Sequence, residues 1–494
     1  MSSLLPEVKA HYGRVRNHVG GEWVESGASR ALDVVNPATA RPIAEVPCST
    51  RAEVEAAIGA AQAAFEEWRE TPPNIRVQPL YRLKALFEDH YEEIARVLVQ
   101  EHGKVIDEAR GSVRRTIDNI ELACGIPSLL MCDSLTDGAA AGIDEEAVRE
   151  PLGVFAAVAP FNFPAMVPFW FWPTAVACGN TFVVKPSEQV PLTQTRIFAL
   201  IEEAGFPEGV VNMVHGDREV VDALLADPRV QGLSFVGSTP IARHVYATAA
   251  AAGKRVQCQG GAKNFVTVMP DANLDATIPN MVASFFGNTG QRCLAGSVLV
   301  AVGDRGDEVV RRFVEAASRI RLGYGLDEAA QMGPLAARRH YDRVLGFVEK
   351  GVAQGARPVL DGRGARVEGF PEGFFVGPTV FDHARPDMAI VQEEVFGPVV
   401  AVLRVGSLDE AIDLANASRF GNASSIYTTS GRSAREYRYR VRAGNIGINL
   451  GVAAPMAYFP FGGRRDSFFG DLHGQGKDGV DFFTDRKVVI TRWV

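Results

Sequence analysis

The chain has 494 residues, of which 47% are hydrophobic and 22% are charged, a composition typical of globular proteins. This length suffices for two or more domain-sized cores, since single cores rarely exceed roughly 250 to 300 residues. The net charge of -8, with Lys and Arg scattered along the chain, excludes the basic surface that nucleic-acid binding needs. A small-molecule partner is therefore expected.

The six cysteines are widely spaced, with no CxxC pair and no Cys/His cluster at metal-ligand spacing. Neither a disulfide framework nor a metal site is expected, and the pattern fits a reducing compartment. The N-terminal segment MSSLLPEVKAHYGR lacks the apolar core of a signal peptide. Both observations predict a cytoplasmic protein.

Residues 151–184 carry no charged side chain and are numerous enough to cross a bilayer. Prolines inside this stretch, at Pro160, Pro164, Pro168 and Pro173, would break a membrane-spanning helix. The stretch therefore predicts a buried strand, loop and helix, and no membrane span.

The first 125 residues begin with turns and strands and continue with helices. HVGGEWV predicts a hairpin, and VVNPATARPIAEV predicts two extended runs joined by an Asn-Pro turn. Residues 50–69 open with Thr50 followed by Glu53, which indicates a capped helix. Two further helical segments are expected before residue 125.

From about residue 153, short apolar runs alternate with helix-length segments. VFAAV, TFVV, VVNMV and GLSFV predict buried strands, and residues 191–204 and 239–252 suit helices. This alternation indicates α/β architecture with a parallel sheet. A second α/β series starts at FVTVM and extends to about residue 450, residues 461–479 are expected to be loop, and KVVITRWV predicts a terminal strand that pairs with another subunit.

Cys293, in GNTGQRCLAGS, is the candidate nucleophile. A thiol reacts as thiolate, and a nearby cation or a helix N-terminus lowers its pKa. Arg292 precedes it, and CLAGSVLVAV is expected to begin a helix whose amides face the sulfur. The alternative, a buried structural cysteine, is the more frequent fate of a single cysteine.

Two stretches are candidates for binding a nucleotide. In GLSFVGSTPIAR a strand ends at Gly237 and Ser238 before a helix, where backbone N–H groups can bind a pyrophosphate. In TFVVKPSE, Lys185 ends a strand and Glu188 follows, a pair that can bind ribose hydroxyls and favours NAD over NADP. An ordinary helix cap and a surface ion pair are the alternatives.

Together, APFNFP, VVKPSE, FVGST, GGAKN, GQRC, EEVFGP and PFGGRRDS resemble the aldehyde dehydrogenase superfamily over almost the full chain. The resemblance implies a Rossmann-type NAD-binding domain (residues 1–133 and 153–264), an α/β catalytic domain (265–455) and a small β oligomerisation segment (134–152 and 456–494). It also implies a homodimer or homotetramer.

The resemblance assigns the chemistry residue by residue. Cys293 matches the nucleophile, which forms a thioester as the aldehyde is oxidised, and Asn162 matches the donor that forms an oxyanion hole with the Cys293 N–H. Positions that match NAD contacts are Ala159, Phe161, Lys185, Glu188, Gln189, Gly237, Ser238, Gly260, Glu394 and Phe396.

Gln259 departs from the hydrolytic members, which have a glutamate there to activate water. An amide cannot accept that proton, so the thioester is expected to await a better nucleophile, and the thiol of coenzyme A fits. FNFPAM, GNTF, MPDA and S-F-x-G-D resemble the CoA-acylating branch, the methylmalonate-semialdehyde dehydrogenases, although that branch usually has Asn at position 259 and Met at position 294.

Arg115 and Arg292 match the arginines that bind the substrate carboxylate in that branch, a task that suits a planar guanidinium. The leading hypothesis is oxidation of malonate or methylmalonate semialdehyde, with NAD and CoA, to acetyl-CoA or propionyl-CoA and CO2. A hydrolytic dehydrogenase in which Glu394 activates water is the runner-up. A catalytically idle binding protein and a cysteine hydrolase without NAD are less favoured, since both leave motifs unexplained.

Overall fold

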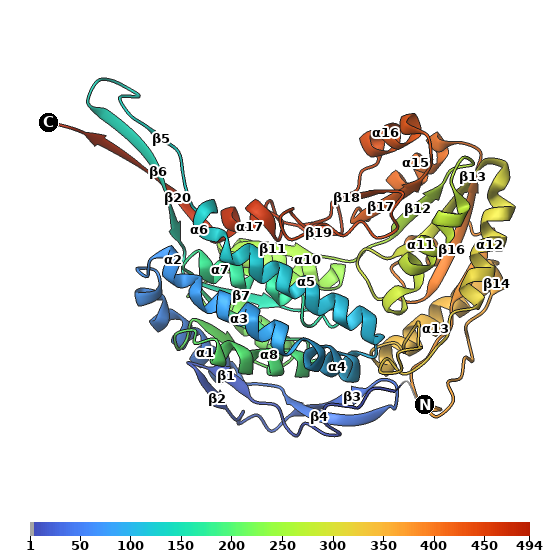
Figure 1. Ribbon diagram of the computed structural model, residues 1–494, viewed down its shortest axis with the longest axis horizontal. Coiled ribbons are helices and arrows are strands. Elements are labelled where there is room, and N and C mark those ends of the chain that lie inside the picture. The colour runs from blue at the N-terminus through green and yellow to red at the C-terminus, as the bar shows by residue number, and fades with distance from the viewer. Residues whose placement is uncertain (1–3) are drawn as a thin grey trace.

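Four β-sheets organise residues 4–494, the part of the chain that this computed structural model describes. Two of the sheets form the cores of two lobes, and a third forms an arm that projects away from them (Figure 1). The fourth is a hairpin of β3 (Ala31–Asn36) and β4 (Arg41–Pro47), as VVNPATARPIAEV predicts.

The eight-stranded sheet of the first lobe has a parallel centre, and its four predicted buried strands are confirmed. In spatial order its strands are β19 (Phe468–Phe469), β11 (Arg255–Gln259), β10 (Val230–Val236), β7 (Val154–Val158), β8 (Thr181–Lys185), β9 (Val211–Met213), β1 (Asn17–Val19) and β2 (Glu22–Val24). The last two form the predicted hairpin.

Helices cover both faces of this sheet. Alternate residues of β7 pack into different hydrophobic cores, because successive side chains of a strand point to opposite faces. Phe155 and Ala157 pack into one core, and Val154 and Ala156 pack into the other. The helices of this lobe are α1 (Arg51–Trp68), α2 (Pro73–Arg76), α3 (Gln78–Asp89), α4 (Tyr91–His102), α5 (Ile106–Cys124), α6 (Ile126–Leu129), η1 (Pro168–Trp170), α7 (Trp172–Ala177), α8 (Leu192–Glu203), α9 (Arg218–Ala226) and α10 (Thr239–Ala251).

The start of α1 shows the predicted cap. Thr50 and Glu53 form a reciprocal capping box, in which each side chain accepts a hydrogen bond from the backbone N–H of the other. Between this helix and residue 125 the structure has three long helices, α3, α4 and α5, where the sequence predicts two.

The second lobe contains a seven-stranded sheet, parallel except at β14. Its strands in spatial order are β14 (Arg357–Leu360), β15 (Thr379–Asp382), β16 (Val399–Val405), β13 (Gly296–Val302), β12 (Asn264–Val268), β17 (Ala423–Tyr427) and β18 (Asn445–Ile448). Its helices are α11 (Leu274–Phe286), η3 (Gly303–Arg305), α12 (Gly306–Ser318), α13 (Arg338–Ala353), α14 (Ala389–Gln392), α15 (Leu408–Ala417) and α16 (Gly431–Arg440).

The arm contains β20 (Thr484–Arg492), β6 (Ile143–Pro151) and β5 (Ser134–Leu135). The terminal strand has a partner in its own chain: β20 pairs antiparallel with β6 along its whole length. This partner lies more than 300 residues earlier, so proximity in sequence could not reveal it, and pairing of the strand with another subunit stays a prediction. Residues 461–479 are also not all loop, since they include β19 and the start of α17 (Gly476–Phe483).

Residues 151–184 fold as predicted, into β7, η1, α7 and β8 inside the first lobe. No helix within residues 4–494 is long and apolar enough to cross a membrane. Membership of the sheets follows the predicted domain boundaries except for β19, which joins the first sheet. The division into domains stays a prediction.

Candidate active site

Cys293 lies between η2 (Gly287–Gly290) and β13. The predicted helix at this position is wrong, because the Val-rich run from Gly296 to Val302 lies as a parallel strand between β12 and β16. Valine packs well on a pleated sheet, and this tertiary context decides the conformation. The thiol therefore has no helix N-terminus of the predicted kind.

The backbone of η2 is strained. Asn288 and Thr289 have φ values of 52° and 56°, a left-handed conformation that costs a non-glycine residue about 1–3 kcal/mol. Contacts with a distant segment hold this turn: Thr289 Oγ1 donates to the Gly333 carbonyl at 2.9 Å, and the Ala336 N–H donates to Gln291 Oε1 at 3.1 Å.

Asn162 lies beside the same turn. Its Nδ2 donates to the Gln291 carbonyl at 3.0 Å, and Lys104 Nζ donates to the Asn162 carbonyl at 2.8 Å. Because an amide group has two N–H donors, Asn162 can donate a second hydrogen bond to a ligand. Asn162 and Cys293 line one cleft, which agrees with the predicted oxyanion hole; the role itself stays a prediction.

The carbonyl of Cys293 is anchored by two amides. Nδ2 of Asn264 and Nδ2 of Asn422 donate to it at 2.8 Å and 2.7 Å. The donors come from β12 and from the residue just before β17, so the second lobe fixes the backbone of the candidate nucleophile.

Burial raises the pKa of the Cys293 thiol to about 12, and the negative charge of Glu394 adds to this effect. Arg292 acts in the opposite direction, but its guanidinium is paired with Glu108 at 2.8 Å. The predicted lowering of this pKa is therefore wrong, and the thiol is protonated at neutral pH.

Two cavities meet at Cys293. The larger, of about 800 Å³, lies along the carboxyl ends of the first lobe's strands, and the smaller, of about 420 Å³, lies against α5. Cys293 lines both. A molecule in each cavity can thus reach the same sulfur from a different side.

Every residue predicted to contact NAD lines the larger cavity, namely Ala159, Phe161, Lys185, Glu188, Gln189, Gly237, Ser238, Gly260, Glu394 and Phe396. At the α10 end of the cavity, Ser238 makes no side-chain capping bond to its helix, so the first-turn N–H groups of Thr239 and Ile241 have no partner from this cap. At Gly261 a Cβ would lie 2.5 Å from Glu394 Oε2, so only glycine allows this close approach.

Lys185 and Glu188 are not a surface pair. Lys185 is only 3% exposed, and its Nζ lies 3.0 Å from Glu188 Oε2. Burial acts to raise the pKa of the Glu188 carboxyl, but Lys185 and a backbone hydrogen bond outweigh it and hold this pKa below its ordinary value. The carboxylate is ionised and can accept hydrogen bonds from hydroxyl groups.

Phe396 has a left-handed backbone with φ 61°. Its carbonyl lies 2.7 Å from His340 Nε2. Burial lowers the pKa of His340 to about 4, so the ring is neutral at physiological pH and donates its Nε2–H to this carbonyl. Both rings also pack against Phe161, which completes an aromatic wall of the larger cavity.

The smaller cavity brings Arg115 and Arg292 together. Arg115 Nη2 donates to the Ala454 carbonyl at 3.3 Å, and Nη1 lies 3.7 Å from Asp118. Neighbouring Arg114 instead forms a bidentate pair with Glu88 on the surface.

Gln259 lies outside both cavities among the described residues. It is buried at the end of β11, and its Nε2 donates to the Phe461 carbonyl at 3.1 Å. Phe461 itself lines the smaller cavity. An amide held in this way does not place a basic group near Cys293.

Sequence reasoning missed four residues that contact the site: Lys104, Glu108, Asn264 and Asn422. No sequence signal marks Lys104 or Glu108, because lysine and glutamate are expected at the surface. GGAKN contains Asn264, but its bond to the Cys293 carbonyl depends on the pairing of β12 with β13.

Comparisons with known proteins match nearly the whole chain to aldehyde dehydrogenases. Residues 23–489 match the Aldehyde dehydrogenase family. Malonate-semialdehyde dehydrogenase 2 of Geobacillus thermodenitrificans is 49% identical over 479 residues, which cover 97% of this chain and 99% of that protein.

Two solved structures superpose closely. A protein from Sinorhizobium meliloti 1021, described as a methylmalonate-semialdehyde dehydrogenase and crystallised with NAD, has a TM-score of 0.96 and 39% identity, and the match covers 98% of each chain. The methylmalonate-semialdehyde dehydrogenase of Oceanimonas doudoroffii has a TM-score of 0.96 and 44% identity, covering 98% of this chain and 99% of that one. With Cys293 at the meeting point of two cavities and full-length matches of this kind, the chain belongs to the aldehyde dehydrogenase family.

Proposed function

We propose that this chain catalyses the NAD-dependent, CoA-acylating oxidation of malonate or methylmalonate semialdehyde, with loss of CO2. The products are acetyl-CoA or propionyl-CoA, and NADH. Support comes from relatives named for these substrates at 39–49% identity. The observation that carries the CoA step is Gln259, an amide bonded to the Phe461 carbonyl where a hydrolytic enzyme needs a base.

The residues of the larger cavity fit NAD. The uncapped amides at the start of α10 suit the pyrophosphate, and the ionised Glu188 carboxylate suits ribose hydroxyls and disfavours a 2′-phosphate. The aromatic wall of Phe161 and Phe396 supplies an apolar surface for a ring. When bound, NAD accepts the hydride from the aldehyde carbon.

Cys293 and Asn162 carry the chemistry of the acyl group in this proposal. The Cys293 thiol releases its proton to solvent, and the thiolate sulfur forms a bond to the aldehyde carbon while the C=O π bond breaks. The alkoxide that develops accepts hydrogen bonds from the second Nδ2–H of Asn162 and from the Cys293 N–H. After oxidation of that carbon, the acyl group is held on the Cys293 sulfur as a thioester.

Arg115 and Arg292 bind the substrate carboxylate in the smaller cavity. A guanidinium offers several N–H donors in one plane and can bind two carboxylates at once. The pairing of Arg292 with Glu108 therefore still leaves donors for a substrate.

The test measures NADH release from methylmalonate semialdehyde with and without CoA. A burst of about one NADH per site that stalls, and then resumes with propionyl-CoA as product once CoA is added, is the expected result. Steady turnover without CoA would refute the CoA step.

A variant pair tests the role of position 259. Gln259→Glu restores a carboxylate and is expected to raise CoA-independent turnover, by roughly 10²-fold if the base is the missing element. Gln259→Met, the matched control, removes the amide without adding a base and should leave that turnover low.

The second candidate is a hydrolytic dehydrogenase in which Glu394 activates water. Glu394 lines the cleft with Cys293, and burial raises its pKa, which makes its carboxylate a stronger base. A free carboxylic acid as product in the CoA-free reaction would favour this candidate.

A further inference from the structure

Glu108 joins two features of the active site that no sequence motif connects. It lies in the first turn of α5, with its side chain 18% exposed, and lines the smaller cavity. Its Oε1 accepts hydrogen bonds from the backbone N–H of Asn288 at 2.6 Å and from Arg292 Nη2 at 2.8 Å. One carboxylate thus contacts both the strained turn and the arginine next to the nucleophile.

The contact with Asn288 matters because the turn is strained. Asn288 and Thr289 are both left-handed, and such conformations persist only where surrounding contacts enforce them. From the first lobe, the Glu108 carboxylate accepts from the backbone N–H of Asn288 within the turn, while the Gly333 carbonyl accepts from Thr289. Three residues separate Thr289 from Cys293, so a shift of this turn moves the sulfur.

The contact with Arg292 fixes the guanidinium. Arg292 Nη1 also donates to the Ala283 carbonyl at 3.4 Å, and a Cβ at Gly287 would lie 2.6 Å from this nitrogen. The guanidinium therefore lies flat against Gly287, and the Glu108 carboxylate lies at one end of the guanidinium. Its positive charge is partly neutralised before any substrate arrives.

We propose that Glu108 is a positioning residue: it holds the turn before Cys293 and the guanidinium of Arg292, and its negative charge limits how strongly Arg292 attracts an anion to the sulfur. The link to the substrate rests on the proposed function, in which that anion is the carboxylate of the aldehyde. The positioning of Cys293 by Glu108 does not depend on the proposed function.

The test compares two alkylating reagents of similar size on the ligand-free protein at pH 8, neutral iodoacetamide and anionic iodoacetate. The site of reaction is checked by peptide mass spectrometry at Cys293. The ratio of the iodoacetate rate to the iodoacetamide rate reports the charge near the sulfur, because the thiolate fraction and the position of the sulfur affect both rates.

Glu108→Gln keeps an acceptor for the Asn288 N–H and removes the charge. Its rate ratio is expected to rise about five-fold, the effect of one partly exposed charge pair. The matched control is Glu88→Gln, which breaks a surface ion pair between Glu88 of α3 and Arg114 of α5, and should leave the ratio unchanged. An unchanged ratio in Glu108→Gln overturns the electrostatic role.

An Arg292→Gln background tests whether the charge acts through the arginine. There the further change Glu108→Gln should raise the ratio much less than in the unmodified chain, since coupled residues give non-additive effects. An equal rise would show that Glu108 acts without Arg292, which contradicts the proposal.

Glu108→Asp tests positioning and keeps the charge. The shorter side chain cannot hold both partners, so the iodoacetamide rate is expected to fall about ten-fold while the ratio of the two rates stays unchanged. Equal iodoacetamide rates in this variant and the unmodified chain refute the positioning role. Melting curves confirm that each variant is folded, and since neither reagent needs aldehyde, NAD or CoA, failure here is distinct from failure of the CoA assay.

Discussion

Cys293 is a protonated thiol in a site that has the parts to stabilise an anion. Burial and the charge of Glu394 both favour the neutral form. The positive charge of Arg292 favours the thiolate, but this charge is paired with the Glu108 carboxylate. The ligand-free protein is therefore expected to hold Cys293 as an unreactive thiol.

The raised pKa predicts how the reactivity of the Cys293 thiol depends on pH. Since the pKa is raised to about 12, the thiolate fraction grows about ten-fold for each pH unit over the whole range below that value. The rate of alkylation by iodoacetamide in the ligand-free protein should rise accordingly between pH 7 and 9.5. A plateau below pH 8 would show that the resting thiol has an ordinary or lowered pKa.

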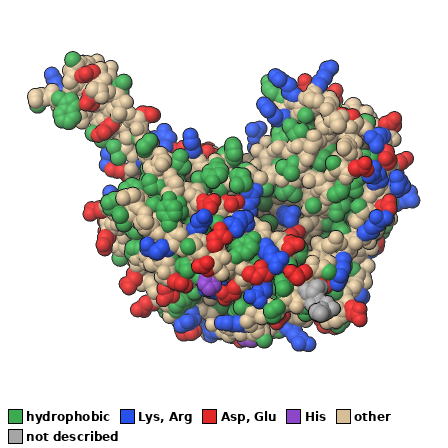
Figure 2. Space-filling view, viewed as in Figure 1, with side chains coloured by type: hydrophobic (Ala, Val, Ile, Leu, Met, Phe, Trp, Pro, Cys, Tyr) green, Lys and Arg blue, Asp and Glu red, His purple; other side chains and the backbone are tan. Residues whose placement is uncertain are grey.

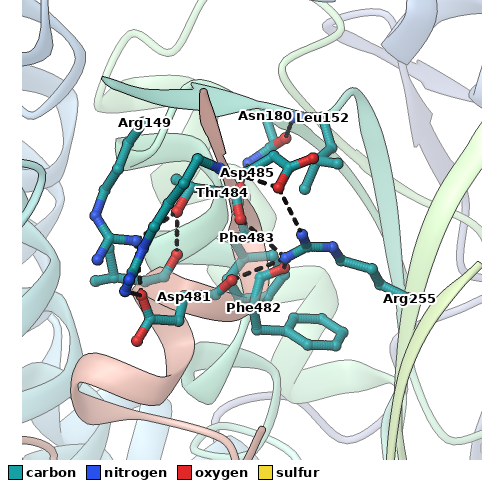
Figure 3. A network of polar contacts seen from close by, with 11 residues as sticks. Arg149, Leu152, Asn180, Arg255, Asp481, Phe482, Phe483, Thr484 and Asp485 are labelled. Carbon is teal, nitrogen blue, oxygen red and sulfur yellow. Dashed lines mark hydrogen bonds and ion pairs between the residues drawn. The ribbon is translucent and has the colours of Figure 1, made fainter. Parts of the chain in front are cut away.

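At the scale of elements, Arg255 fixes the end of α17 where the arm begins. Its Nη1 donates to the carbonyls of Asp481, Phe482 and Thr484 at 2.8, 3.0 and 2.9 Å, as Figure 3 shows. Asn180 Nδ2 donates to the Phe483 carbonyl at 2.7 Å. The last carbonyls of a helix have no partner within it, and a cation there also interacts favourably with the helix dipole.

Replacing Arg255 by Ala is expected to destabilise this junction by about 1–3 kcal/mol, the contribution of hydrogen bonds from a charged donor. Hydrogen exchange of residues 476–483 should become faster. Arg51→Ala, which breaks one exposed ion pair with Glu55, is the control and should cost less than about 0.5 kcal/mol. Unaltered exchange in the Arg255 variant would contradict the capping role.

At the scale of the whole molecule, the arm extends from the first lobe and exposes apolar side chains, which appear in green at its end in Figure 2. Leu135, Val488, Ile490 and Trp493 are each more than half exposed. Within residues 4–494, β20 pairs with β6 on one edge only. An apolar strand with a free edge favours pairing with another chain, which supports the proposed homodimer or homotetramer.

Two lysine substitutions in β20 test whether this strand mediates oligomerisation. Light scattering of the unmodified chain should give a multiple of 53.3 kDa, and Val488→Lys with Ile490→Lys should lower the mass toward one chain, because charges on an edge strand oppose pairing. Ile75→Lys, an exposed isoleucine of α2, is the control. A mass of one chain before any substitution would refute the prediction.

Local sequence determined much of the fold. The capping box of Thr50 and Glu53 and the hairpin at HVGGEWV depend on contacts within a few residues. The four buried strands of the first lobe pair with distant strands, but their continuous apolar runs mark them as buried strands of a parallel sheet. The motifs also identified residues around the larger cavity, since APFNFP, VVKPSE and FVGST follow or end the parallel strands β7, β8 and β10, whose carboxyl ends meet at one edge of the sheet. Glu394 and Phe396 come from the second lobe, between α14 and β16.

Tertiary structure alone decided the rest. Whether GSVLVAV forms a helix or a strand depends on β12 and β16 beside it, and the partner of β20 lies more than 300 residues away. The ionisation of Cys293 and the contacts of Arg292 depend on burial and on Glu108, which comes from another lobe. Sequence records which groups are present, but distance and exclusion of water set their energies, and both arise only when remote segments pack together.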